Sequence, residues 1–267
     1  MHGSGFLMEL TAVNNPQVKA AAELKQKKYR QQRGLFLAEG LRTVEESVAY
    51  RQAESIYYTA IEDERTRAVL EAAAAQQVKL YCVSDAVLKK IADTETPQGI
   101  IAVCKMQSTS MEQLLAKGKM LLVLDRVGDP GNVGTMLRTA DAAGIGGLVL
   151  LKGSVDIYAP KTVRSSMGSL FHVPVLAGVS EEGFIKEAHN AGYELLVTCL
   201  DGADNLYKAD LHGRLAFVMG NEANGVSAGL LAAADKRVYI PMAGRAESLN
   251  VAMAAGIVMF EALRQGL

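Results

Sequence analysis

Apolar residues in this chain occur in short, nearly continuous runs, and longer segments with helical periodicity separate these runs. Runs of four to eight apolar residues are typical of buried strands, whereas apolar positions at i, i+3, i+4 and i+7 predict amphipathic helices. The second half of the chain has the clearest runs, because they consist almost entirely of Leu, Val, Ala, Phe, Met and Ile. In this half we expect strands at residues 120–125, 147–151, 193–198, 215–219 and 237–240.

Helix-length segments connect these strands. Apolar strands joined by helical crossovers indicate a parallel sheet that is buried on both faces. The pattern therefore predicts an α/β domain over residues 118–267. Its helices are expected at residues 132–143, near 160–168, at 181–190 and at 248–265.

The first half of the chain alternates in the same way and predicts a smaller α/β domain over residues 9–104. Residues 105–117 are mostly polar, with at most a short helix around Leu114 and Leu115, and are predicted to be a linker. The expected helices are 16–32, one through Val44 and Val48, 62–77 and 85–92, and the expected strands are 34–38, 55–59, 79–83 and 99–104.

Composition places the chain among ordinary globular proteins. It has 267 residues, 49 % of them apolar and 21 % charged, which suits two domains of about 100–200 residues each. No apolar run is long enough to cross a membrane, and the first seven residues lack the basic start of a signal peptide. The three cysteines are far apart, so neither a disulfide framework nor a zinc site is predicted, and a reducing cytoplasm is expected.

Basic residues gather in one segment, although the net charge of the whole chain is −1. Residues 16–33 contain a single acid, Glu23. Such a local excess can bind RNA phosphate, although a solvated helix face has the same composition. The basic side chains are Lys19, Lys25, Lys27, Lys28, Arg30 and Arg33.

Several classes of α/β enzyme are excluded by their missing motifs. The glycines of residues 143–147 precede a strand, whereas a dinucleotide-binding loop must follow one. There is no Walker A sequence and no serine in a nucleophile elbow. The histidines are scattered along the sequence, so no metal is predicted.

Three short segments place polar residues beside strongly apolar runs. Residues 132–138 read Asn-Val-Gly-Thr-Met-Leu-Arg, residues 220–226 read Gly-Asn-Glu-Ala-Asn-Gly-Val, and residues 248–252 read Ser-Leu-Asn-Val-Ala. Ligands bind in open α/β folds at the carboxyl ends of the strands, where such loops lie. The three segments are therefore expected to build one site.

In order and type, these segments resemble the SpoU/TrmH family of RNA ribose 2′-O-methyltransferases over roughly residues 118–267. The resemblance implies a homodimer, S-adenosylmethionine as methyl donor, and a trefoil knot in the C-terminal domain, a rare exception to unknotted topology. The alternation of the first half, with Phe-Leu-Ala-Glu-Gly at residues 36–40, resembles the ribosomal-protein-like substrate-binding domain that precedes many members.

The resemblance also assigns roles to individual residues. Arg164 is a further candidate for RNA phosphate, with a solvated face as the alternative. The donor would be held by Gly220, Asn221, Ile240 and Leu249, with Thr198 and Cys199 beside its adenosine. Catalysis would rest on Arg138, Asn132, Glu222, Ser248 and Asn250.

Each catalytic candidate also has an ordinary structural alternative. Arg138 could pair with Asp141 on its own helix, and Asn132 and Ser248 could be helix N-caps. Glu222 could be a solvated loop residue, and Asn250 could simply lie in the first turn of the closing helix. The family reading makes Arg138 a group that helps to deprotonate the ribose hydroxyl. Guanidinium is effectively always protonated, so we expect Arg138 to bind phosphate and stabilise the developing alkoxide.

The predicted function is methylation of a ribose 2′-hydroxyl in structured RNA, with ribosomal RNA favoured over tRNA. A knotted methyltransferase that acts on a base nitrogen is one alternative. An RNA-binding assembly factor without catalysis is another, although all three segments retain their polar residues.

Overall fold

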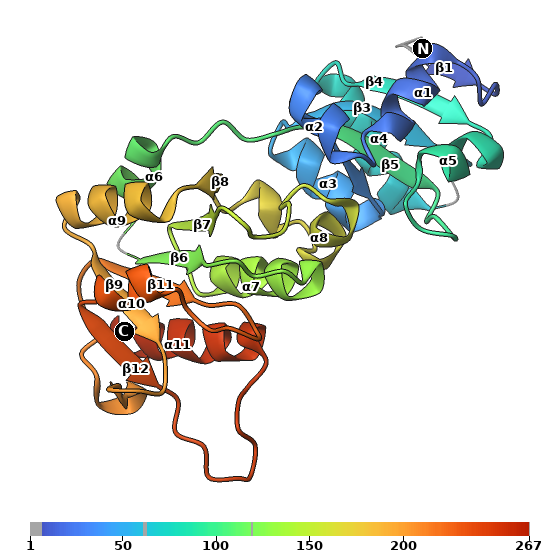
Figure 1. Ribbon diagram of the computed structural model, residues 1–267. Coiled ribbons are helices and arrows are strands. Elements are labelled where there is room, and N and C mark those ends of the chain that lie inside the picture. Colours follow the sequence, from blue (N-terminus) through green and yellow to red (C-terminus); the bar gives the residue numbers. More distant parts are fainter. Residues whose placement is uncertain (1–6, 61–62, 119, 267) are drawn as a thin grey trace. The chain divides into compact units, whose positions relative to one another are not determined.

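The computed structural model of the protein describes residues 7–60, 63–118 and 120–266 (Figure 1). Of the first seven residues, to which no function is assigned from the sequence, residues 1–6 lie outside this range. The chain forms two compact units. The N-terminal unit contains the residues up to Met106 together with Tyr158–Phe171, and the C-terminal unit contains Gln107–Ile157 and the residues from His172 onward.

The N-terminal unit is built on a mixed five-stranded sheet, which contains the four strands that the alternating pattern predicts and one further strand, β1, that the sequence analysis missed. The sheet has the order β1-β4-β3-β5-β2, in which β5 runs antiparallel to both of its neighbours. Its strands are β1 (Leu7–Leu10), β2 (Leu35–Glu39), β3 (Ala53–Tyr58), β4 (Lys79–Val83) and β5 (Ile100–Lys105). The helices between them are α1 (Pro16–Glu23), α2 (Lys27–Arg33), α3 (Leu41–Ala49), α4 (Glu64–Ala75) and α5 (Asp85–Ile91).

The first expected helix is divided into two helices in the structure. The periodicity predicts a continuous helix over 16–32, but α1 ends at Glu23 and α2 begins at Lys27. Arg30 explains the break, because its side chain is buried and its Nη1 donates to the carbonyl oxygens of Leu24 (2.8 Å) and Lys25 (2.7 Å). The guanidinium thus satisfies carbonyls that the end of α1 leaves without helical partners.

Residues 158–171 belong to the N-terminal unit, whereas the sequence analysis placed them in the C-terminal domain. They form α8 (Pro160–Ser165) and the short 3₁₀ helix η1 (Ser169–Phe171). Their apolar side chains supply the reason, since the rings of Tyr158 and Phe171 lie 4.9 and 5.9 Å from the buried Phe36 ring on β2.

The C-terminal unit has the parallel sheet that the apolar runs predict. Its order is β10-β12-β9-β11-β6-β7-β8, and every pairing in it is parallel. The predicted strands are β6 (Met120–Leu124), β7 (Gly147–Leu151), β9 (Glu194–Thr198), β11 (Leu215–Met219) and β12 (Lys236–Tyr239). The sequence analysis missed β8 (Val175–Val179) and β10 (Asp204–Asn205), which are the edge strands and are only partly buried.

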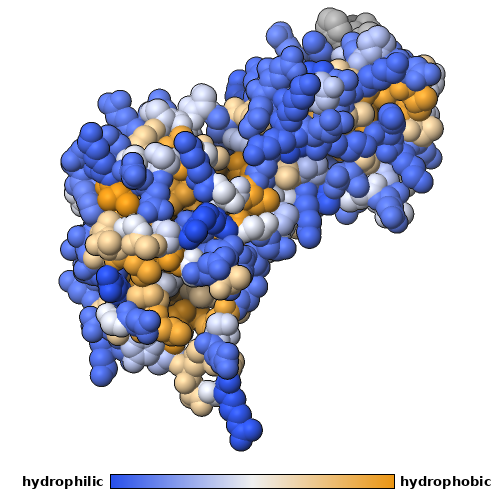
Figure 2. Space-filling view, in the orientation of Figure 1, coloured by the Kyte–Doolittle hydropathy of each residue, from blue (hydrophilic) through white to orange (hydrophobic). Residues whose placement is uncertain are grey.

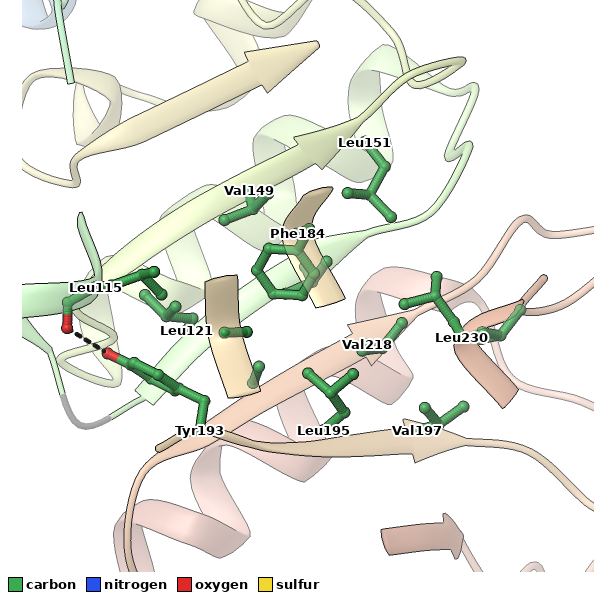
Figure 3. Packing of buried hydrophobic residues seen from close by; sticks show 14 of the residues in the cluster. Leu115, Leu121, Val149, Leu151, Phe184, Tyr193, Leu195, Val197, Val218 and Leu230 are labelled. Atoms are coloured by element: carbon green, nitrogen blue, oxygen red, sulfur yellow. Dashed lines mark hydrogen bonds between the residues drawn. The ribbon is translucent and has the colours of Figure 1, made fainter. Parts of the chain in front are cut away.

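Helices cover both faces of this sheet. On one face, α6 (Met111–Lys117), α9 (Glu181–Asn190) and α10 (Ala228–Ala232) contribute to one buried cluster with the strands (Figure 3). In this cluster Phe184 lies among Val149, Leu195 and Val218. The helices α7 (Pro130–Ala142) and α11 (Val251–Gly266) pack on each other and on β7 and β11, outside this cluster.

The predicted linker contributes to this core. Residues Met111–Lys117 form α6, which starts with a capping box between Ser110 and Gln113. Leu114 and Leu115 are buried in the same cluster as Phe184, and the predicted linker belongs to the C-terminal unit from Gln107 onward. In the described ranges no helix has the length and apolar character needed to cross a membrane.

The carboxylate of Glu261 on α11 accepts several hydrogen bonds, and their contribution to stability can be tested. Arg264 donates to both of its carboxylate oxygens (2.7 and 2.9 Å) and Gln265 donates at 2.9 Å. These hydrogen bonds lower the pKa of Glu261 from 4.5 to about 2. The resulting stabilisation is present above the unfolded-state pKa and is lost as the pH falls through the folded-state value.

We predict that Glu261→Gln lowers the melting temperature at pH 6 and that its difference from the native protein narrows as the pH falls from about 4.5 toward 2. Thermal unfolding of both proteins across this range measures the difference. A difference that stays constant with pH would contradict the role of the carboxylate charge.

Candidate functional site

The carboxyl ends of β9, β11 and β12 meet at one edge of the parallel sheet, and a cavity of about 490 Å³ lies there. This size is typical of small-molecule sites. Apolar side chains such as Met219, Val226 and Val238 form part of its wall. It is also lined by all the residues predicted to hold the donor, which are Thr198, Cys199, Gly220, Asn221, Ile240 and Leu249, and by Glu222, Ser248 and Asn250.

The side chain of Asn132 joins the three predicted segments. Its Nδ2 donates to Oε1 of Glu222 (3.0 Å), 90 residues further along the chain. Its Oδ1 accepts from Nδ2 of Asn250 (3.0 Å), 118 residues further along. One amide group therefore fixes two residues of the cavity rim relative to α7.

The side-chain amide of Asn132 is free to make these two contacts because another residue caps α7. The helix α7 starts at Pro130, and the N-cap is Asp129, whose Oδ1 accepts the backbone N–H of Asn132 (2.7 Å). Asn132 is therefore in the first turn of α7, so the N-cap alternative for it is wrong. Asn250, not Ser248, takes the capping position of α11, because its Oδ1 accepts from the N–H groups of Ala252 (2.9 Å) and Met253 (3.3 Å).

Gly220 lies at a close approach of two backbone segments. A Cβ atom at this position would lie 2.3 Å from the carbonyl carbon of Gly225 and 2.4 Å from the nitrogen of Val226. Asn221 and Gly225 close the loop with two backbone hydrogen bonds (3.0 and 2.9 Å). Gly225 has a φ of +66°, which favours glycine. Gly220 therefore cannot be replaced without moving this wall of the cavity, whereas a side chain at Gly225 would have room but an unfavourable backbone conformation.

The groups that face the cavity are suited to binding a ligand. No backbone–backbone hydrogen bond joins Ile240 or Leu249 to another described residue outside the regular ladders, so their polar groups can serve a ligand. Burial raises the pKa of the Cys199 thiol, which disfavours a thiolate nucleophile. The described residues contain no cluster of three or more His, Cys, Asp or Glu that could hold a metal ion.

Arg138 is exposed on α7, and its side chain makes no hydrogen bond or ion pair within the described residues. The pairing with Asp141 does not occur, because Asp141 is bound to Nδ1 of His172 (2.8 Å). Arg138 is also absent from the lining of the cavity. At 1.5 Å of rise per residue, it lies about 9 Å along the helix from Asn132.

Among the basic residues of the N-terminal unit that are predicted to bind RNA, some have partners within the protein and others are exposed. The prediction that Arg30 contacts RNA is wrong, because its side chain is buried and donates to the carbonyl oxygen of Leu24 at the end of α1. Lys25 donates to the carbonyl oxygens of Lys90 and Ala92, and Arg33 pairs with Glu23. Arg164 pairs with Asp93 (2.8 Å) and lies 3.8 Å from Glu39. Lys27 and Lys28 are exposed.

Comparisons with known proteins identify the family of both parts of the chain. Residues 119–260 match the SpoU rRNA methylase family, and residues 15–102 match the MRM3-like substrate binding domain. The 23S rRNA (guanosine(2553)-2′-O)-methyltransferase RlmP of Bacillus subtilis is 36 % identical over 255 residues, which are 95 % of this chain and 98 % of RlmP.

Solved structures are similar in fold over nearly the whole chain. An AdoMet-bound rRNA methyltransferase from Sinorhizobium meliloti is similar with a TM-score of 0.87 and 33 % identity, covering 98 % of this chain and 99 % of that one. The SpoU methyltransferase AviRb from Streptomyces viridochromogenes, in complex with AdoMet, has a TM-score of 0.85 and 28 % identity, covering 95 % and 98 %. On its sequence and its fold, the chain belongs to the SpoU rRNA methylase family.

Proposed function

We propose that this protein transfers a methyl group from S-adenosylmethionine to a ribose 2′-hydroxyl of ribosomal RNA. The observation that carries the proposal is the Glu222–Asn132–Asn250 network on the rim of the 490 Å³ cavity. The names of relatives support the substrate, since RlmP and RlmB are 23S rRNA 2′-O-methyltransferases.

The cavity fits the methyl donor. Apolar side chains and the backbone at Gly220, Ile240 and Leu249 line it, and such groups suit an adenosine. S-adenosylmethionine, when bound, supplies a methyl group on a sulfonium, and the neutral thioether that leaves needs no protonation. The protein then has to hold the acceptor hydroxyl in line and ease the loss of its proton, which is mainly a matter of positioning.

The polar rim is suited to the acceptor. We assign Glu222, Asn132 and Asn250 to orienting the ribose, with Ser248 beside them on the lining. Arg138 contributes a permanent positive charge, which binds RNA phosphate and stabilises the alkoxide that develops on the 2′-oxygen.

We also propose that the active protein is a homodimer. Met253 and Phe260 on α11 are 62 % and 47 % exposed, and apolar areas are visible on the surface of this unit (Figure 2). Gly256, on the same face of α11, lies against Thr139, because a Cβ at Gly256 would be 3.5 Å from its Cγ2. A second copy that covered this face would therefore lie close to Arg138.

Further parts of the proposal rest on the family. The C-terminal unit is assigned a trefoil knot, the N-terminal unit a role in binding RNA through Lys27 and Lys28, and the whole protein a place in the cytoplasm. Ribosomal RNA is preferred to tRNA because the relatives that match nearly the whole chain include a 23S rRNA enzyme. A base-nitrogen methyltransferase and a non-catalytic assembly factor are disfavoured by the 2′-O-methyltransferase names of the relatives.

Gly220→Ala provides a test of the donor site. The added Cβ would clash with Gly225 and Val226, so the loop must move and the cavity must change shape. We predict that the native protein binds S-adenosylmethionine in isothermal titration calorimetry and that Gly220→Ala binds at least about tenfold more weakly.

Gly128→Ala is the matched control, because a Cβ at Gly128 meets nothing within 4 Å, and it should bind as the native protein does. Equal binding by Gly220→Ala and the native protein would place the donor elsewhere. If the native protein binds no donor even with RNA present, the assembly-factor alternative is favoured.

The role of Arg138 is tested by the pH dependence of the rate. We predict that Arg138→Ala reduces methyl transfer by about 10²–10³-fold, the usual effect of removing a group that stabilises an oxyanion. Arg138→Lys should restore part of the rate without adding a new ionisation to the pH–rate profile. A fully restored rate with a lysine-like pKa would instead support general-base catalysis.

A further inference from the structure

We propose that Asp125 and Arg126 are positioning residues for the methyl-transfer reaction, because they hold both ends of the loop that carries Glu222. The loop, residues 221–227, connects β11 to α10. Neither Asp125 nor Arg126 lines the cavity, so both would act through Glu222. This inference rests on the function proposed above.

Asp125 holds the end of the loop. It follows β6 directly and is 2 % exposed. Its Oδ2 accepts the backbone N–H of Ser227 (2.7 Å), and its own N–H donates to the carbonyl of Met219 (2.9 Å). A buried carboxylate that accepts a backbone N–H is a strong, charge-assisted tie. The Ser227 hydroxyl donates in turn to Oε2 of Glu181 on α9 (2.7 Å).

Arg126 holds the start of the loop with its backbone. Its carbonyl oxygen accepts from Nδ2 of Asn221 (2.9 Å). Arg126 has a φ of +54°, a left-handed conformation that is unfavourable for a residue with a Cβ. Such strain persists where the surroundings enforce it, and it is frequent at functional sites.

The two residues support each other. The guanidinium of Arg126 binds the Asp125 carboxylate through Nε (3.0 Å) and Nη2 (3.2 Å). This pair compensates the buried negative charge of Asp125, and it raises the pKa of Arg126 above its ordinary value. The carboxylate therefore fixes Ser227 and the side chain of Arg126 at the same time.

Between Asn221 and Ser227 the loop is also held by hydrogen bonds of its own. Oδ1 of Asn221 accepts the N–H groups of Ala223 (3.0 Å) and Asn224 (3.1 Å), and the Asn221–Gly225 hydrogen bonds close the loop. These hydrogen bonds couple the position of Glu222 to both anchors of the loop. A shift at Asp125 would be transmitted to Glu222 and would break its 3.0 Å contact with Asn132.

Asp125→Asn tests this mechanism. The substituted amide offers an NH₂ group where two donors, the Ser227 N–H and the Arg126 guanidinium, now meet a carboxylate. At least one of the three hydrogen bonds that the carboxylate accepts must therefore be lost. Because a displacement of about 1 Å can cost about 10²-fold in rate, we predict that kcat with a 23S rRNA transcript falls about 10–100-fold. Binding of S-adenosylmethionine by calorimetry should change less than about threefold.

A double-mutant cycle separates positioning from a general loss of stability. If Asp125 acts through Glu222, Asp125→Asn should cost little further rate in a Glu222→Gln background. Asp235→Asn is the matched control, since Asp235 also accepts a backbone N–H, that of Leu195 (2.8 Å), and binds a basic ring, that of His189. It supports the same sheet away from the loop and should leave the rate unchanged in both backgrounds.

Additive effects of Asp125→Asn and Glu222→Gln would overturn the proposal. Should Asp125→Asn fail to fold, Arg126→Gln removes the half-exposed guanidinium and should show the same non-additivity at a smaller cost. A native protein without methyl transfer would instead contradict the proposed function, so the two failures are distinguishable.

Discussion

The hydrogen-bonded amide of Asn132 is the contact on which the site depends. Its nitrogen and its oxygen are both engaged, one by Glu222 and the other by Asn250. Each partner belongs to a different segment, and each lines the cavity. The amide is available because Asp129, three residues earlier, caps α7 in its place. Because Asp129 is the N-cap, the side chain of Asn132 is not needed for capping and can bind Glu222 and Asn250 instead.

The parallel sheet provides the setting for this contact. Because all its strands run in one direction, β6, β9, β11 and β12 present their following loops at the same edge. The buried Asp125 at the end of β6 ties the loop after β11 to this edge through Ser227. The close approach at Gly220 then shapes the cavity wall. The loop after β11 thus contributes both Gly220 and Glu222 to the cavity lining, and hydrogen bonds through Asn132 link Glu222 to Asn250 on a third segment.

The sequence predicts the central strands because they follow from local signals, whereas the individual cavity residues follow from the resemblance of the three polar segments to the family. The apolar runs of β6, β7, β9 and β11 are continuous, and the polar segments follow strand ends. The features that the sequence pattern does not predict depend on contacts between residues that lie apart in the chain. The burial of Arg30 breaks the expected first helix, and the packing of Tyr158 on Phe36 assigns a segment to the other unit. Asp125 could have been suspected, since it is an acid directly after a buried strand, but its partner Ser227 lies 102 residues away.

The most direct test is to identify the position of the transferred methyl group. A 23S rRNA transcript is incubated with the native protein and with S-adenosylmethionine that carries a labelled methyl group, and the RNA is then hydrolysed in alkali. Alkaline cleavage requires a free 2′-hydroxyl, so a ribose methyl group protects the adjacent bond. Label in alkali-resistant dinucleotides is the predicted result. Label only in mononucleotides would mean that a base is methylated and would contradict the account.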